Sequence, residues 1–306
     1  MTRPLADPAF VAAAARRPQL WRLVIGLLLI AAPIYLVGSV AMISGWMVFL
    51  YGADVAKAAQ ALADRTEPSV VLVLLASFVF MALGAWIAAR KMHGRRLHEM
   101  IGPPRPNARD FLIGAAVILG LNLLVVIWYA ATEPLVPGLP VRTWLMLLPL
   151  SLGLLLLQTG AEELLFRGYF QGQLMARFAS PLVWMLLPAM AFAVLHLNPA
   201  SAGANAWPIV AAIFIFGLVA ADLTALTGRL GAAWGFHFGN NVIAILVIAV
   251  EGGLPALALA RTPFSLADPE AGGMAMLLDG AVILLAWFLV RTLLKRALQP
   301  HGAANT

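Results

Sequence analysis

Two adjacent glutamates and an arginine lie in an otherwise apolar stretch, Gln158-Thr-Gly-Ala-Glu-Glu-Leu-Leu-Phe-Arg-Gly. On a helix, Glu163 and Arg167 are four residues apart and share one face, so the spacing predicts an ion pair between them. Glu162 is turned about 100° away and has no cation at that spacing. Because charged groups in apolar helices usually face a cavity or a partner, Glu162 is predicted to be the carboxylate available for chemistry.

Two further groups in apolar stretches could complement this carboxylate. His196 ends the apolar run that includes Phe192, and His237 and Asn241 are four residues apart, so they project from one face of a helix. A carboxylate and an imidazole can activate a water molecule, while histidine and asparagine N–H groups can stabilise an oxyanion. The set predicts water-mediated acyl hydrolysis. Each group taken alone has an alternative interpretation. It could hold the helices together, through an ion pair or through interhelical hydrogen bonds.

The elements that must position these residues are membrane-spanning helices. The chain has 306 residues, of which 62% are hydrophobic and 11% charged, whereas a soluble domain has about 25% charged residues. The apolar runs predict an all-α polytopic transmembrane bundle of about eight spans, with the catalytic core in helices four to seven. The predicted spans are 23–50, 68–89, 111–131, 143–166, 181–197, 208–227, 231–250 and 272–290.

The basic residues predict the orientation of this bundle. With the N-terminus in the cytoplasm, 16 of the 20 Lys and Arg residues fall inside, among them Arg3, and only Lys57, Arg65, Arg142 and Arg261 fall outside. This asymmetry follows the positive-inside rule and accounts for the net charge of +6 without nucleic acid as a partner. We expect a multi-pass protein of the plasma (inner) membrane, with cytoplasmic segments at 1–22 and 291–306 and the bundle at 23–290.

Helix lengths place Glu162 and His196 at one depth. If helices four and five form a hairpin that turns near Ala179, each residue lies 17 positions from the turn. This requires helix four to continue to Arg177, and its length then calls for a tilt or a break near Pro149 or Gly160. Glycines 235 and 239, which flank His237, would let another backbone or a substrate come close.

Two other acids lie in predicted spans. Asp222 is predicted either to orient His237 or to pair with Arg229 or Thr224, and Asp279 is predicted to have a structural role near the outer interface. The zinc motif H-E-x-x-H, a G-x-S-x-G element and a G-x-G-D element are absent from the sequence, as is cysteine.

The three motifs, in their order along the chain, resemble those of the CPBP intramembrane proteases, which include the CAAX prenyl endopeptidases and bacteriocin-processing proteins. Residues 162–168 resemble E-E-x-x-x-R with Phe-Arg-Gly, residues 192–196 resemble F-x-x-x-H, and residues 237–241 resemble H-x-x-x-N. The resemblance covers a core of about 140–250.

The resemblance implies an intramembrane endopeptidase of the glutamic type, without metal or cofactor. It implies that Glu162 is the general base, that His196 helps to activate the water, and that His237 and Asn241 form the oxyanion hole, with Glu163 and Arg167 in supporting roles. The implied partners are a peptide or protein substrate and the lipid bilayer. Two histidines and two glutamates could equally bind zinc, so a zinc-dependent metalloprotease remains an alternative. A non-catalytic membrane partner or transporter is another alternative, because intramembrane acids and histidines also suit proton relays.

Overall fold

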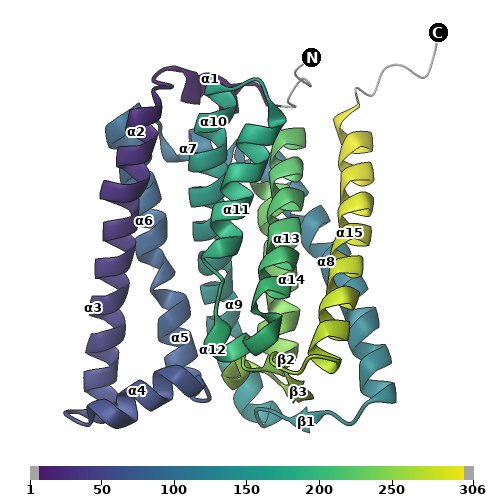
Figure 1. The fold of residues 1–306 in the computed structure, drawn as a ribbon. Coiled ribbons are helices and arrows are strands. Elements are labelled where there is room, and N and C mark those ends of the chain that lie inside the picture. Colours follow the sequence, from purple (N-terminus) through teal and green to yellow (C-terminus); the bar gives the residue numbers. More distant parts are fainter. Residues whose placement is uncertain (1–6, 300–306) are drawn as a thin grey trace.

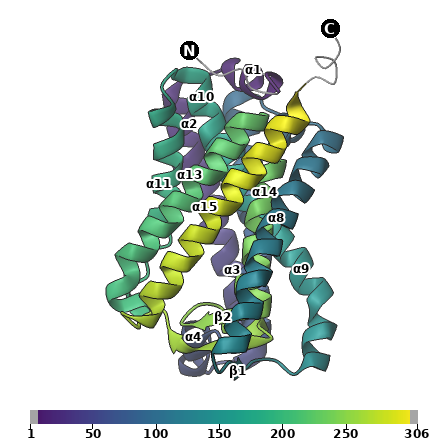
Figure 2. The ribbon, with the colours of Figure 1, turned by 90° about the vertical axis from the view of Figure 1, so that its right-hand side faces the viewer.

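The protein is a bundle of roughly parallel helices with a small sheet at one end (Figure 1). The computed structural model describes residues 7–299; Arg3 and the outer parts of the predicted segments 1–22 and 291–306 lie outside the described residues. Helix α1 and the last turn of α15 lie at one end of the bundle, which we call the terminal end. Strands β1 to β3 lie at the opposite end, which we call the sheet end, together with α4 and α12 (Figures 1 and 2).

The first part of the chain forms two long apolar helices connected by α4 at the sheet end. Each long helix contains a π-helical turn, and short helices at the terminal end precede and follow the pair. The elements are α1 (Ala9–Ala15), α2 (Leu20–Ile25), a π-helical segment (Gly26–Ala31), α3 (Ala32–Tyr51), α4 (Val55–Asp64), α5 (Pro68–Ala76), α6 (Phe78–Ala88), a π-helical segment (Ala89–His93) and α7 (Leu97–Ile101).

The second part of the chain forms the rest of the bundle and the sheet. The first elements are α8 (Pro104–Thr132), β1 (Val136–Pro137), α9 (Val141–Glu163), a π-helical segment (Leu164–Gln171), α10 (Gly172–Arg177), a second π-helical segment (Leu182–Leu186), α11 (Leu187–Val194) and α12 (Pro199–Ala202). They are followed by a 3-10 turn (Gly203–Asn205), α13 (Ala206–Thr227), α14 (Gly231–Val242), a π-helical segment (Ile243–Val247), β2 (Ile248–Glu251), a 3-10 turn (Pro255–Leu257), β3 (Ala260–Ser265) and α15 (Ala271–Leu298).

The predicted all-α membrane bundle is confirmed, with a difference in the spans. Six helices in residues 7–299 are long and apolar enough to cross a bilayer, and they correspond to six of the eight predicted spans. The predicted spans 181–197 and 231–250 are shorter helices, which end at Val194 and Val247. After Val247 the chain turns into β2, where β-branched residues precede Gly252 and Gly253, so the last residues of that prediction are a strand.

The fourth span is one uninterrupted helix from Val141 to Arg177, as the hairpin prediction requires. Pro149 lies inside it without ending it. The departure from α-helical geometry comes at Leu164, directly after Glu163, and not at Pro149 or Gly160 as predicted. A π-helical turn shifts the register of the residues that follow it, and such turns are frequent at functional sites.

Helix α14 packs against α8 through glycines at every fourth position. A Cβ atom at Gly235 would lie 2.0 Å from the carbonyl oxygen of Phe111, and one at Gly231 would lie 2.1 Å from that of Asn107. These glycines therefore bring the two backbones into contact, as small residues do between membrane helices. The prediction of a close backbone approach at Gly235 is confirmed, and the contact fixes the rotation of α14 and hence the direction of His237.

The sheet is small and closes the sheet end of the bundle. Its order is β1-β3-β2, with β1 antiparallel and β2 parallel to β3. Strand β2 follows α14 after one π-helical turn, so Ile248 and Val250 reach the cavity described below.

Candidate active site

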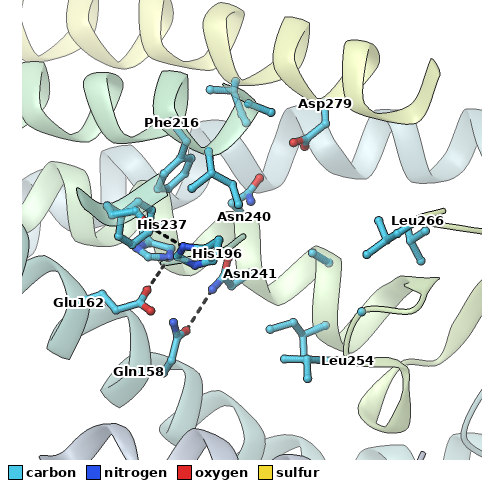
Figure 3. A pocket seen from close by; sticks show the side chains of 18 of the residues that line it. Gln158, Glu162, His196, Phe216, His237, Asn240, Asn241, Leu254, Leu266 and Asp279 are labelled. Carbon is cyan, nitrogen blue, oxygen red and sulfur yellow. Dashed lines mark hydrogen bonds and ion pairs between the residues drawn. The ribbon is translucent and has the colours of Figure 1, made fainter. Parts of the chain in front are cut away.

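A cavity of about 500 Å³ lies among α9, α11, α13, α14 and α15. Four predicted site residues line it: Glu162 from α9, His196 just after α11, and His237 and Asn241 from α14. Figure 3 shows these four side chains pointing toward one another, Glu162 from α9, His196 from the turn after α11, and His237 and Asn241 from α14. Residues that are up to 79 positions apart in the sequence are thus gathered within the bundle.

Glu163 and Arg167 form the predicted ion pair, which is confirmed at 3.0 Å between Glu163 Oε1 and Arg167 Nη1. The same Oε1 lies 2.8 Å from His237 Nδ1. All three side chains are at least 95% buried. Since an ionised carboxylate can only accept, the Nδ1 of His237 carries its hydrogen, and Nε2 faces the cavity side.

Glu162 contacts the other nitrogen of the same ring, with 3.4 Å between its Oε2 and His237 Nε2. This oxygen is buried and has no hydrogen-bond partner among residues 7–299. The sequence put Glu162 and His196 at one depth, and both line the cavity. The contact of Glu162 with His237 was not predicted, because it depends on how α9 and α14 pack. Buried carboxylate oxygens ordinarily take a partner, so this one is suited to accept from a water or a substrate.

His196 is held by the backbone of α11, the helix that it follows. Its Nδ1 lies 2.8 Å from the carbonyl oxygen of Phe192, to which it must donate because a carbonyl only accepts. In the neutral ring, Nε2 is then the acceptor. The side chain is exposed at the wall of the cavity rather than buried.

Phe192 is a site residue for which the sequence alone gave no role. Its ring packs on His196 with 4.7 Å between centroids and meets His237 edge-on at 6.0 Å. The guanidinium carbon of Arg167 lies 4.7 Å from the centre of the same ring. The phenylalanine of F-x-x-x-H thereby fixes the positions of both imidazoles and of the arginine.

Gln158 is a second residue that the sequence reasoning missed. Its Oε1 accepts a hydrogen bond of 3.1 Å from Asn241 Nδ2, so it orients the amide and leaves the second Nδ2 hydrogen for another acceptor. A signal for it exists in the sequence, since Gln158 lies four residues before Glu162 and shares its face of the helix.

The predictions for Asp222 were wrong. Its carboxylate lies 2.7 Å from Arg291 Nε and accepts from Trp287 as well, and so pairs with α15. Arg229 pairs instead with the buried Asp110, at 2.7 Å. Neither partner could be predicted, because both pairs join helices more than 60 positions apart.

Asp279 lines the same cavity (Figure 3). It also lines a neighbouring cavity of about 500 Å³ between α8 and α15. It lies about 12 Å along α15 from the start of that helix, at 1.5 Å per residue. Within residues 7–299, no group of three or more His, Cys, Asp or Glu side chains is arranged to hold a metal ion.

The fold and the cavity define a class: a helical membrane protein with carboxylates and imidazoles gathered inside the bundle. Residues 143–243 match the family model described as type II CAAX prenyl endopeptidase Rce1-like. The segment from α9 to α14, which carries the four predicted site residues, is thus similar to the Rce1-like family, in agreement with the resemblance drawn from the three motifs.

One relative of similar sequence is the Bacillus subtilis protein YyaK, whose description is "Uncharacterized protein". It is 28% identical over 189 residues, which make up 59% of this chain and 63% of YyaK. The similarity therefore spans less than two thirds of that relative. No solved structure matches the chain.

Proposed function

We propose that the protein is an intramembrane endopeptidase that hydrolyses peptide bonds with a water activated by Glu162 and His196. The observation that carries the proposal is the gathering of Glu162, His196, His237 and Asn241 around one cavity, in a segment that matches the Rce1-like endopeptidases. A carboxylate base, an imidazole and amide donors meet the requirements for acyl hydrolysis.

In the proposed reaction, Glu162 Oε2 takes a proton from the water, whose other hydrogen is accepted by His196 Nε2. The water oxygen attacks the carbonyl carbon of the scissile bond, and the carbonyl oxygen becomes an oxyanion. When the carbon–nitrogen bond breaks, protonated Glu162 returns its proton to the leaving amine, so the atoms and charges balance.

His237 Nε2 and Asn241 Nδ2 would donate to the oxyanion. For Nε2 to donate while Nδ1 donates to Glu163, the ring must be an imidazolium. Two carboxylates, Glu162 and Glu163, then balance two cations, Arg167 and His237, within the buried cluster. This balance supports the oxyanion role because it avoids an uncompensated buried charge.

The test compares new protein N-termini in cells that express the wild-type protein or Glu162→Gln at equal membrane abundance. Glu270→Gln, at an exposed position before α15, is the matched control. We expect termini that occur with the wild type and the control and are lost with Glu162→Gln. If the three proteins give the same termini under conditions in which all are folded, the protease proposal fails, and a binding or transport role takes its place.

A further inference from the structure

The catalytic cavity extends from the Glu162–His237 level toward the sheet end of the bundle. Gly253, Leu254 and Leu266 line it there, and the same residues and His196 also line a second cavity of about 430 Å³. Figure 3 shows Leu254 and Leu266 on the strand-and-loop side, away from Glu162 and His237. We call this region, lined by Gly253, Leu254, Leu266 and His196, the mouth.

The second cavity reaches the loops of the sheet end. Its further lining includes Arg65 after α4, Asn198 and Ser201 around α12, and Gly252 after β2. These segments lie at the end of the bundle opposite α1 and the last turn of α15 (Figure 1). The space around the catalytic groups therefore reaches the sheet end of the bundle.

Toward the terminal end, the site is closed by packed side chains. Tyr169 and Gln171 from the helix of Glu162 and Phe236 from the helix of His237 each have no exposed surface. Gln171 Nε2 donates to the carbonyl oxygen of Ala221 at 2.9 Å, which joins this layer to α13. Beyond it, Arg95 is fully buried and donates to the carbonyl oxygen of Gly168 at 2.8 Å.

The basic residues indicate which end of the bundle faces the cytoplasm. The sheet end carries Lys57 on α4, Arg65 after it, Arg142 in the first turn of α9 and Arg261 on β3. The segments at the terminal end carry the clusters at 16–22, 90–96 and 291–296. By the positive-inside rule, the terminal end is cytoplasmic and the mouth faces the opposite side.

We propose that the active site is entered from the non-cytoplasmic face through the mouth. The substrate is then a polypeptide segment exposed on that face, and not the prenylated tail of a cytosolic protein. The wall between the mouth and the catalytic groups is apolar, with Leu75, Ile213 and Ile245, so the residues next to the scissile bond are apolar. This assignment of the substrate class rests on the proposed protease function.

The chain contains no cysteine, so a single introduced thiol reports the access to one position. Leu254→Cys places a thiol at the mouth, and Arg296→Cys places one near the end of α15, at the terminal end. Intact cells are treated with a membrane-impermeant maleimide before or after permeabilisation. Ala200→Cys, exposed on α12, replaces Leu254→Cys if the latter does not fold.

We expect Leu254→Cys to be labelled in intact cells and Arg296→Cys only after permeabilisation. Once a cleaved substrate is identified, labelling from outside should reduce cleavage by Leu254→Cys at least tenfold and leave that by Arg296→Cys unchanged. Labelling of Arg296→Cys in intact cells, with Leu254→Cys protected until permeabilisation, would overturn the proposal. So would labelling of Ala200→Cys from outside while Leu254→Cys stays unlabelled under both conditions, because the mouth would then be closed.

The labelling pattern does not depend on catalysis. The same two thiols introduced beside Glu162→Gln should be labelled identically. A protein that is labelled as expected but cleaves nothing contradicts the protease function and leaves the direction of access standing, whereas a protease with the opposite labelling contradicts only the direction.

Discussion

His237 directs its Nδ1 toward Glu163, with 2.8 Å between that nitrogen and Oε1. This one contact determines that Nε2 is the nitrogen available on the cavity side. Glu163 is in turn held by Arg167, so a buried ion pair on α9 and the following π-helical turn orients an imidazole on α14. Glu163 and Arg167 act as positioning residues in this arrangement.

Glu163→Gln should impair both folding and catalysis. It leaves the buried charge of Arg167 without its carboxylate, which costs about 3–5 kcal/mol in the free energy of unfolding. Glu162→Gln keeps the Glu163–Arg167 ion pair and should lower kcat with a smaller loss of stability than Glu163→Gln. The measurement is thermal unfolding of the detergent-solubilised variants alongside kcat on an identified substrate.

The double variant Glu163→Gln/Arg167→Gln is the control for the ion pair. Removing both charges should recover part of the stability that Glu163→Gln loses, since no buried charge is left unpaired. Recovery of stability without recovery of kcat would separate the positioning of His237 from the packing of the helix. If the losses of stability from the two substitutions add in the double variant, the ion pair itself does not contribute to stability.

Asn241→Ala should lower kcat by about 10²–10³-fold with little change in KM, because an oxyanion donor acts in the transition state. Gln158→Ala removes the acceptor that orients this amide at 3.1 Å, and we expect a smaller loss of kcat through Asn241. Steady-state kinetics of both variants gives the comparison. An increase in KM alone for Asn241→Ala would assign Asn241 to substrate binding and contradict the oxyanion role.

Chelators should leave activity unchanged if the water is activated by Glu162 and His196 without metal. The assay compares the purified protein before and after exhaustive treatment with EDTA and 1,10-phenanthroline. Loss of activity that zinc restores, while magnesium does not, would favour the metalloprotease alternative. The expected result is equal kcat within error in all samples.

How much could be predicted depended on the distance in sequence between the partners. The Glu163–Arg167 pair follows from helical spacing. The apolar run alone predicted a span that ends at residue 166, and the hairpin argument extended that helix to Arg177, where it ends. The contact between Glu162 and His237 depends on how α9 and α14 cross, which spacing within one helix cannot specify. The prediction for Asp222 was wrong for the same reason. Its partner Arg291 lies on α15, and the sequence does not say where that helix packs.

The sheet was missed for a different reason. Its strands have two to six residues, and β2 continues an apolar run without a polar break. Such a short run is ambiguous between helix and strand until its partner is known. The consequence is functional, since the residues that line the mouth, Leu254 and Leu266, belong to the segments around this sheet.

Gly235→Ala should disturb the site through the packing of α14 against α8. The added Cβ would lie 2.0 Å from the carbonyl oxygen of Phe111, so α14 must move away from α8 or rotate, and His237 moves with it. We expect a loss of roughly 1–3 kcal/mol in stability, as for overpacking in a core, and a lower kcat. Thermal unfolding and steady-state kinetics measure the two effects.

Gly120→Ala on α8 is the matched control, because a Cβ at that position has no neighbour within 4 Å. Alanine is favoured over glycine inside a helix by about 1 kcal/mol, so this variant should be as stable as the wild type or slightly more so. Equal effects of the two substitutions would mean that the contact between α8 and α14 does not set the position of His237. A loss confined to Gly235→Ala would show that the backbone contact between α8 and α14, and not the glycine content of the helices, holds α14 in place.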